Sequence, residues 1–291
     1  MSLDGAISVL VTITLVEMMV VVGLQVTLAE LVDSFGNWRL LGRAAVANYV
    51  VLPSMTVALL TIVDASPMVT TGFLILAVCP GAPFGPSFAR IAGADVPQSV
   101  GLMIMLAGSS AVISPLLLKG LLPYVSQSEA LRLSLVGILR ALVTIQLLPL
   151  LIGLLVRRQC PGWANKLIGP LDFFSKILTL VVVCLIMGAQ FRTLTEIRLT
   201  GFIGMSVLLM GSLLIGWLAG GPSRACRKSM ALATSLRNVG LGLVIATDNF
   251  ASSPVISAAL VYGIMQIVAS LAVAFWWGRE VQPNSSSGPT L

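Results

Sequence analysis

The sequence predicts an all-α integral membrane protein with about nine transmembrane helices, and three observations support this fold class. The chain is strongly apolar, with a mean hydropathy of +1.02, and only 10% of its 291 residues are charged, whereas soluble domains carry about 25%. Apolar segments of about 20 residues, long enough to cross a bilayer as helices, follow one another along the chain. Two of these segments are interrupted in a way that indicates broken helices inside the membrane.

Nine apolar segments have the length of a membrane span. Short connections separate them, so we expect neighbours in the sequence to be antiparallel neighbours in space. The last segment of the chain, residues 279–291, contains Pro, Asn, Ser and Gly and is predicted to be a disordered cytoplasmic tail. The predicted spans cover approximately residues 7–32, 41–62, 67–90, 97–121, 131–156, 167–188, 201–218, 227–247 and 252–276.

Basic residues are distributed unevenly between the two sides of these spans. With the N-terminus outside and the C-terminus in the cytoplasm, ten lie at cytoplasmic ends and four at outer ends, as the positive-inside rule requires. We therefore expect a multi-pass protein of the inner or plasma membrane, whose net charge of +6 does not indicate nucleic-acid binding. The cytoplasmic residues are Arg39, Arg43, Arg90, Arg157, Arg158, Lys166, Arg224, Arg227, Lys228 and Arg279, and the outer ones are Lys119, Arg132, Arg192 and Arg198.

The sequence offers little for catalysis or metal binding. It contains no histidine, which removes the commonest metal ligand and general base. The four cysteines are scattered without a CxxC pair, so they indicate neither a disulfide framework nor a metal site. We expect no enzyme, no cofactor and no metal.

Two blocks of three helices each have an interrupted middle helix. In the first block, residues 79–86 include three prolines and two glycines, which break a helix because proline lacks the backbone donor. In the second block, residues 234–240 place an arginine, an amide and hydroxyls at membrane depth. The blocks begin on opposite sides of the membrane, so we expect inverted repeats. Paired interruptions in two such halves indicate a transport site, and we predict a secondary transporter that works by alternating access.

The residues around these breaks resemble the bile acid:sodium symporter family. Cys79-Pro80-Gly81, followed by Gly93-Ala94-Asp95-Val96 and Ser99-Val100, is similar to the family's CPG…G-D-V…SV segment. Residues 109–117 resemble its S-T-L-x-x-P-L-L run, residues 237–243 its Q-N-S-G-L-A-x segment, and residues 21–26 its G-M-G-L-T-L segment. The similarity covers nearly the whole chain in the same order.

This resemblance implies a core domain and a panel domain. The resemblance also implies that the substrates are organic anions such as bile acids, steroid sulfates or small carboxylates. The core would consist of repeat A, residues 41–122, and repeat B, residues 199–278. The panel would consist of helix 1, residues 1–40, and helices 5 and 6, residues 123–198.

The chain departs from the family at the residues that would bind sodium. Gly85 and Pro86 replace a Ser-Asn pair, Met103 replaces a threonine, and Ala233 and Arg237 replace a glutamate and a glutamine. Because a guanidinium is always protonated, it would repel a cation nearby. We therefore doubt sodium coupling, and we hypothesise that Arg237 permanently supplies the positive charge that sodium supplies elsewhere.

The candidate site residues lie at the two breaks or correspond to family site positions. For several of them a structural role is the alternative: an ion pair for Arg237, an interhelical hydrogen bond for Gln266, and small-residue packing for Ser109. Glu17 and Arg140, in the first and fifth spans, would form either a structural ion pair or a proton-titrating site. The candidates are Asn48, Pro80, Gly81, Gly85, Pro86, Ser99, Ser109, Thr234, Ser235, Arg237, Asn238 and Gln266.

The predicted function is therefore transport of a small organic anion without sodium, by uniport, exchange or proton coupling. One alternative is a sodium-coupled symporter with a rearranged ion site. A second is a membrane sensor that keeps this fold and transports nothing. The expected partners are the substrate anion and the lipid bilayer, with a homodimer left open and no nucleic acid.

Overall fold

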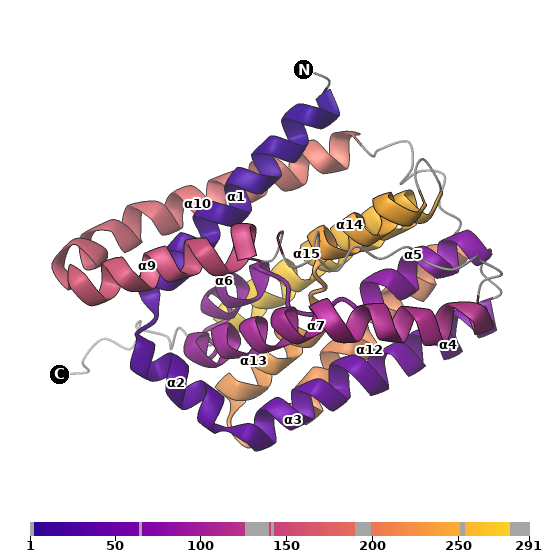
Figure 1. Ribbon diagram of the computed structural model, residues 1–291, viewed down its shortest axis with the longest axis horizontal. Helices are drawn as coiled ribbons and strands as arrows, with labels where there is room; N and C mark the ends of the chain where they lie inside the picture. The colour runs from indigo at the N-terminus through magenta and orange to yellow at the C-terminus, as the bar shows by residue number, and fades with distance from the viewer. Residues whose placement is uncertain are drawn as a thin grey trace, which may run out of the picture.

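The computed structural model describes residues 3–63, 66–125, 140, 143–189, 199–250 and 254–279. In these ranges every regular element is helical (Figure 1). The elements are α1 (Leu3–Gln25), α2 (Leu28–Gly36), α3 (Trp38–Val46), the π-helical segment η1 (Ala47–Val51), α4 (Leu52–Val63), α5 (Pro67–Ala77), α6 (Phe84–Ile91), α7 (Val96–Val125), the π-helical segment η2 (Val143–Leu147), α9 (Leu148–Gln159), α10 (Pro161–Ala189), α12 (Leu199–Ala219), α13 (Arg224–Ser235), α14 (Val239–Asn249) and α15 (Pro254–Arg279).

Several helices have the length and composition of membrane spans. Within the described ranges, three continuous helices qualify, namely Trp38–Val63, Gly201–Ala219 and Pro254–Arg279, and up to five do if each of two bent pairs counts as one span. The bent pairs are Thr12–Gln25 with Leu28–Gly36, at 90°, and Val96–Ser110 with Val112–Pro123, at 56°. The count of nine spans remains a prediction, because parts of the fifth span and the tail lie outside the described residues.

The first predicted span, residues 7–32, is wrong as a continuous helix. α1 ends at Gln25 and α2 begins at Leu28, because Thr27 and Glu30 form a capping box. The Thr27 side chain accepts a hydrogen bond from the Glu30 backbone, and the Glu30 carboxylate accepts one from the Thr27 backbone at 2.8 Å. The Thr-x-x-Glu pattern of a helix start is readable in the sequence and outweighs the apolar run around it.

α1, α9 and α10 pack against one another, and Figure 1 shows them gathered on one side of the molecule. Gly23 of α1 and Gly153 of α9 make this possible, since a Cβ on Gly153 would lie 2.2 Å from the Val20 carbonyl oxygen. The other helices are joined by contacts such as α12 with α13 and α5 with α15. The division into a panel domain and a core domain remains a proposal.

The α1–α9 contact yields a stability prediction. Gly153→Ala should lower the melting temperature of the purified protein in detergent, because the new methyl group overlaps the α1 backbone, which is typically worth about 1–3 kcal/mol. Gly162→Ala is the matched control, since a Cβ on this exposed α10 residue meets nothing within 4 Å. Equal melting temperatures for the two variants would contradict the close approach of α1 and α9.

Candidate functional site

The first break separates α5 from α6. Six residues, Val78 to Pro83, are not helical, and Gly81 has a φ of 87°, a conformation that residues with a Cβ rarely adopt. A Cβ on Gly81 would lie 2.3 Å from the backbone nitrogen of Ala107 on α7. The hydroxyl of Ser114, also on α7, donates to the carbonyl of Val78. α7 therefore supports the break along its length and leaves the next carbonyls free for other partners.

The second break separates α13 from α14. Leu236 is extended, with a ψ of 120°, and the Asn238 side chain caps α14 by accepting from the backbone of Leu241 at 3.0 Å. Between them, the backbone of Arg237 is held by one side chain of α15. The Arg237 N–H donates to Gln266 Oε1 at 3.0 Å, and Gln266 Nε2 donates to the Arg237 carbonyl at 3.1 Å. Gln266 thus bonds both backbone groups of Arg237, whose carbonyl also accepts from the N–H of Val239 at 2.9 Å.

The two breaks meet each other directly. The backbone N–H of Asn238 donates to the carbonyl of Cys79 at 2.8 Å, and its side-chain amide lies 3.4 Å from the carbonyl of Gly81. The amide of Gln146, on η2, approaches the same Gly81 carbonyl at 3.5 Å. Segments 157 residues apart in the sequence are therefore joined by backbone and amide hydrogen bonds at one junction.

Arg237 is buried at this junction, with 2% of its surface exposed. Its Nη2 donates to the Thr234 carbonyl at 2.6 Å, whereas its Nη1 has no hydrogen-bond partner. The ionisable groups that influence it are Tyr262, Cys79 and Tyr49, all neutral side chains in their usual forms. In the part of the chain that is described, no carboxylate pairs with it.

Asn48 contacts Thr234, the residue whose carbonyl accepts from Arg237. Asn48 lies on the π-helical segment η1, a type of widened turn that is frequent at functional sites. Its Nδ2 donates to the Ala44 carbonyl at 2.9 Å and lies 3.4 Å from Thr234 Oγ1. Its Oδ1 is buried without a partner. Because the Ala44 carbonyl can only accept, the side-chain nitrogen must face it, and the oxygen is the unpaired atom.

The structure brings some of the predicted residues together and separates others. Asn48, Gly81, Thr234, Arg237, Asn238 and Gln266 belong to the hydrogen-bonded junction just described. Pro80 lies in the same break, whereas Gly85 and Pro86 are buried on α6. Ser99 is buried with an unpaired hydroxyl and is the nearest contact of a Cβ on Gly85, at 3.8 Å. Ser235 pairs with Ser270 of α15 at 3.2 Å.

Sequence reasoning missed four residues around the two breaks, namely Tyr49, Tyr262, Gln146 and Ser114. The Tyr49 hydroxyl lies 2.7 Å from Ser109 Oγ and donates to the Leu106 carbonyl at 2.8 Å, so Ser109 is a partner of Tyr49. Tyr262 stacks on Phe73 with ring centroids 5.1 Å apart. Polar residues within apolar spans were the available signal for Gln146 and Ser114, because such residues need partners in the membrane.

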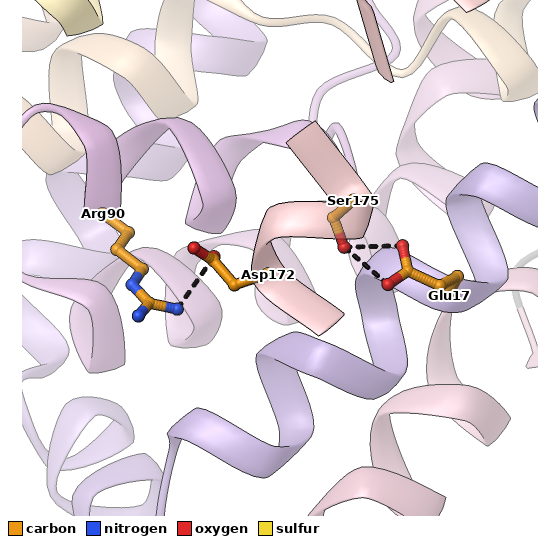
Figure 2. A network of polar contacts seen from close by, with 4 residues as sticks. All are labelled: Glu17, Arg90, Asp172 and Ser175. Atoms are coloured by element: carbon orange, nitrogen blue, oxygen red, sulfur yellow. Dashed lines mark hydrogen bonds and ion pairs between the residues drawn. The ribbon is translucent and has the colours of Figure 1, made fainter. Parts of the chain in front are cut away.

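Figure 2 shows a second polar network, which connects α6 to α10 and α10 to α1. Arg90 Nη1 lies 2.8 Å from Asp172 Oδ1, and Ser175 Oγ lies 2.6 Å from both carboxylate oxygens of Glu17. The expected Glu17–Arg140 ion pair is therefore wrong: α10 packs along α1 and brings Ser175 to the carboxylate, while Arg140 is exposed. Arg90–Asp172 is an ion pair between α6 and α10.

Comparisons with known sequences found a matching family and two similar proteins. A sequence profile described as the Sodium Bile acid symporter family matches residues 12–197. The chain belongs to this family. It is 22% identical over 279 residues to a probable sodium/metabolite cotransporter BASS2, chloroplastic, of Oryza sativa subsp. japonica. This match covers 94% of this chain and 65% of the rice protein. It is 20% identical over 247 residues to the uncharacterized sodium-dependent transporter YocS of Bacillus subtilis (strain 168), at 83% and 74% coverage.

Membership in this family confirms the predicted resemblance, the integral membrane class and the expectation that the protein is not an enzyme. The chain spans 65% of the length of the rice relative. For this chain, the activity of the whole rice protein is therefore only a proposal.

The conformation of Gly81 yields a prediction for the first break. Gly81→Ala should reduce the yield of folded, monodisperse protein, because alanine is strained at a φ of 87° and its methyl group would overlap the backbone of Ala107. Gly108→Ala is the matched control on α7, where a Cβ meets nothing within 4 Å. Size-exclusion profiles in detergent compare the two, and a normal profile for Gly81→Ala would contradict the contact between the break and α7.

Proposed function

We propose that the protein is a secondary transporter that moves small organic anions by alternating access and does not use sodium. The single observation that carries this proposal is Arg237. A fully buried guanidinium at the junction of two broken helices has an unpaired N–H, and no carboxylate among the described residues faces it. Burying an unpaired charge costs several kcal/mol, so such a residue marks a functional site in a membrane protein by default.

The junction itself supports transport over a purely structural role. Non-helical backbone at membrane depth persists where it is surrounded by protein or lines a pathway. Two breaks that meet, one in each of two helical blocks, form the usual place for a substrate in secondary transporters. The helix N-termini of α6 and α14 begin at these breaks, and their dipoles favour an anion there.

The proposal of sodium independence rests on the ligands available. Sodium requires several oxygen atoms, and a neighbouring carboxylate usually offsets its charge. Here a guanidinium stands at the second break, and two unit charges about 4 Å apart at an effective dielectric of about 20 repel each other by roughly 4 kcal/mol. Uniport, exchange and proton coupling remain as modes, and Glu17, which accepts from Ser175 within the α1–α10 contact, is the candidate proton site.

The proposed motion is a displacement of the core blocks against α1, α9 and α10, with the N-terminus outside and the C-terminus in the cytoplasm. The Arg90–Asp172 pair joins α6 to α10 and would have to separate in such a movement. With side chains 37% and 18% exposed, the pair is of the kind that contributes only about 0–1 kcal/mol. It would therefore impose little resistance.

A sodium-coupled symporter is the second candidate, because the names of both relatives refer to sodium. In that case the ion would use atoms away from Arg237, such as the buried and unpaired Ser99 hydroxyl beside Gly85. A sensor without transport is the third candidate.

Counterflow in proteoliposomes separates these candidates. We would measure exchange of labelled taurocholate, estrone sulfate and propionate in sodium chloride and in choline chloride. We expect exchange of at least one anion at equal rates in both salts. A steep sodium dependence would support the symporter, and no exchange with any anion would support the sensor.

Arg237→Gln tests the residue on which the proposal depends. This variant loses a hydrogen bond from a charged group, which is worth about 1.5–3 kcal/mol. The half-saturating concentration of the transported anion should therefore rise roughly 10- to 100-fold. Arg39→Gln, which removes an exposed arginine next to Trp38, is the matched control and should leave transport unchanged. Unchanged transport by Arg237→Gln would assign the arginine a structural role.

A further inference from the structure

The unpaired atoms at the junction describe the chemistry of a ligand. Among the residues that the structure describes, three buried side-chain nitrogen or oxygen atoms have no hydrogen-bond partner: Asn48 Oδ1, Ser99 Oγ and Arg237 Nη1. Two of them, on Asn48 and Arg237, belong to side chains that bond the same residue, Thr234. Buried polar atoms are normally paired, so two such atoms on one hydrogen-bonded triad indicate a binding site.

We infer that Asn48 and Arg237 together bind a monovalent hydroxycarboxylate, whose carboxylate is held by Arg237 Nη1 and whose hydroxyl donates to Asn48 Oδ1. This inference rests on the proposed function, because it identifies the class of anion taken by the same site. It makes Asn48 the residue that determines specificity, whereas the proposed function requires only the charge of Arg237.

The charge of the ligand follows from the charge of the site. Arg237 contributes one positive charge, and the groups that influence it electrostatically, Tyr262, Cys79 and Tyr49, are neutral in their usual forms. One carboxylate therefore makes the loaded site neutral. A dicarboxylate would leave one buried negative charge without a partner, which is costly in a low-dielectric interior. The site should reject dianions.

The hydroxyl follows from the hydrogen-bonding limits of Asn48. Its amide nitrogen is committed to the Ala44 carbonyl at 2.9 Å, and the remaining atom, Oδ1, can only accept. A carboxylate oxygen cannot satisfy it, because both atoms are acceptors. A ligand that satisfies both Asn48 and Arg237 must therefore carry a hydrogen-bond donor as well as an anionic group.

The surrounding contacts hold both side chains in place. The backbone of Arg237 is fixed by Gln266, its Nη2 is fixed by Thr234, and Asn48 is anchored to its own helix through Ala44. Neither unpaired atom can turn towards another partner without breaking these bonds. A site preorganised in this way discriminates against a ligand that lacks the donor, because the acceptor would remain buried and unpaired.

Four probes test the ligand class: 2-hydroxypropionate, 3-hydroxypropionate, propionate and malonate. Thermal stabilisation of the purified full-length protein, in sodium-free buffer at pH 7, gives apparent affinities. We expect at least one hydroxypropionate to bind roughly 10- to 100-fold more tightly than propionate, from the cost of one unsatisfied buried acceptor. Malonate should bind more weakly than that hydroxypropionate. Equal affinities for the two hydroxypropionates and propionate, or no stabilisation by any probe, would overturn the inference.

Asn48→Asp tests the site from the protein side. The aspartate keeps the shape of the amide but places a carboxylate in the triad that Asn48 forms with Thr234 and Arg237, so the protein supplies its own anion. Binding of the hydroxypropionate should fall at least tenfold, because the protein's own carboxylate competes with that of the ligand and aspartate also loses the donor that faces the Ala44 carbonyl. Asn37→Asp is the matched control, because Asn37 is an exposed helix cap and aspartate caps equally well.

Two further outcomes separate this inference from the proposed function. If Asn48→Asp fails to fold, Arg237→Gln serves in its place and should lose the preference for hydroxypropionate over malonate. If either variant binds all four probes as the unmodified protein does, the junction holds only a bound water and the inference is overturned. Sodium-free counterflow of taurocholate or estrone sulfate would in that case still support the proposed function.

Discussion

The structure depends on one constraint: two stretches of non-helical backbone must satisfy their hydrogen bonds away from water. The break after α5 frees carbonyl groups, and the break after α13 frees N–H groups. The Cys79 carbonyl and the Asn238 N–H satisfy each other across the junction, at 2.8 Å. Gln266 then satisfies both backbone groups of Arg237. Since each break completes the other, neither α6 nor α14 could be placed independently.

This solution satisfies the backbone but leaves the side chains at the junction incomplete. The polar groups that hold the breaks together are amides and hydroxyls, which can bond a guanidinium without neutralising it. Arg237 consequently has a backbone in which every polar group is paired and a side chain with one nitrogen unpaired. A residue that served only to hold the fold would more simply be neutral, like the glutamine that the family resemblance implies at this position, because a neutral side chain carries a smaller desolvation cost. The proposed function accounts for the charge by an anionic ligand.

The sequence predicted features that depend on local chemistry better than features that depend on packing between distant helices. The breaks were predictable because proline and glycine act on their own backbone, and Asn238 was predictable as an amide next to the second break. The end of α1 was also encoded locally, in Thr27 and Glu30, but the apolar run concealed it. Pairings across helices could not be inferred in this way. Nothing local indicates that Asp172 bonds Arg90 on α6, or that Glu17 faces Ser175 instead of Arg140, because both depend on how α10 packs along α1.

The departures from the sodium ligands that the family resemblance implies can be explained, under the proposed function, as one coordinated change. A site that loses the glutamate at position 233 and gains an arginine at position 237 becomes more positive by two charges. That is the charge of two sodium ions, so in the proposed sodium-independent transporter Arg237 would maintain the field felt by an anionic substrate without any bound ion. This charge could not leave, so an empty carrier would contain a buried cation, whereas a carrier loaded with a monovalent anion would be neutral. Substrate would then provide the countercharge that makes the junction easier to move through the membrane, so exchange of one anion for another should be the favoured mode.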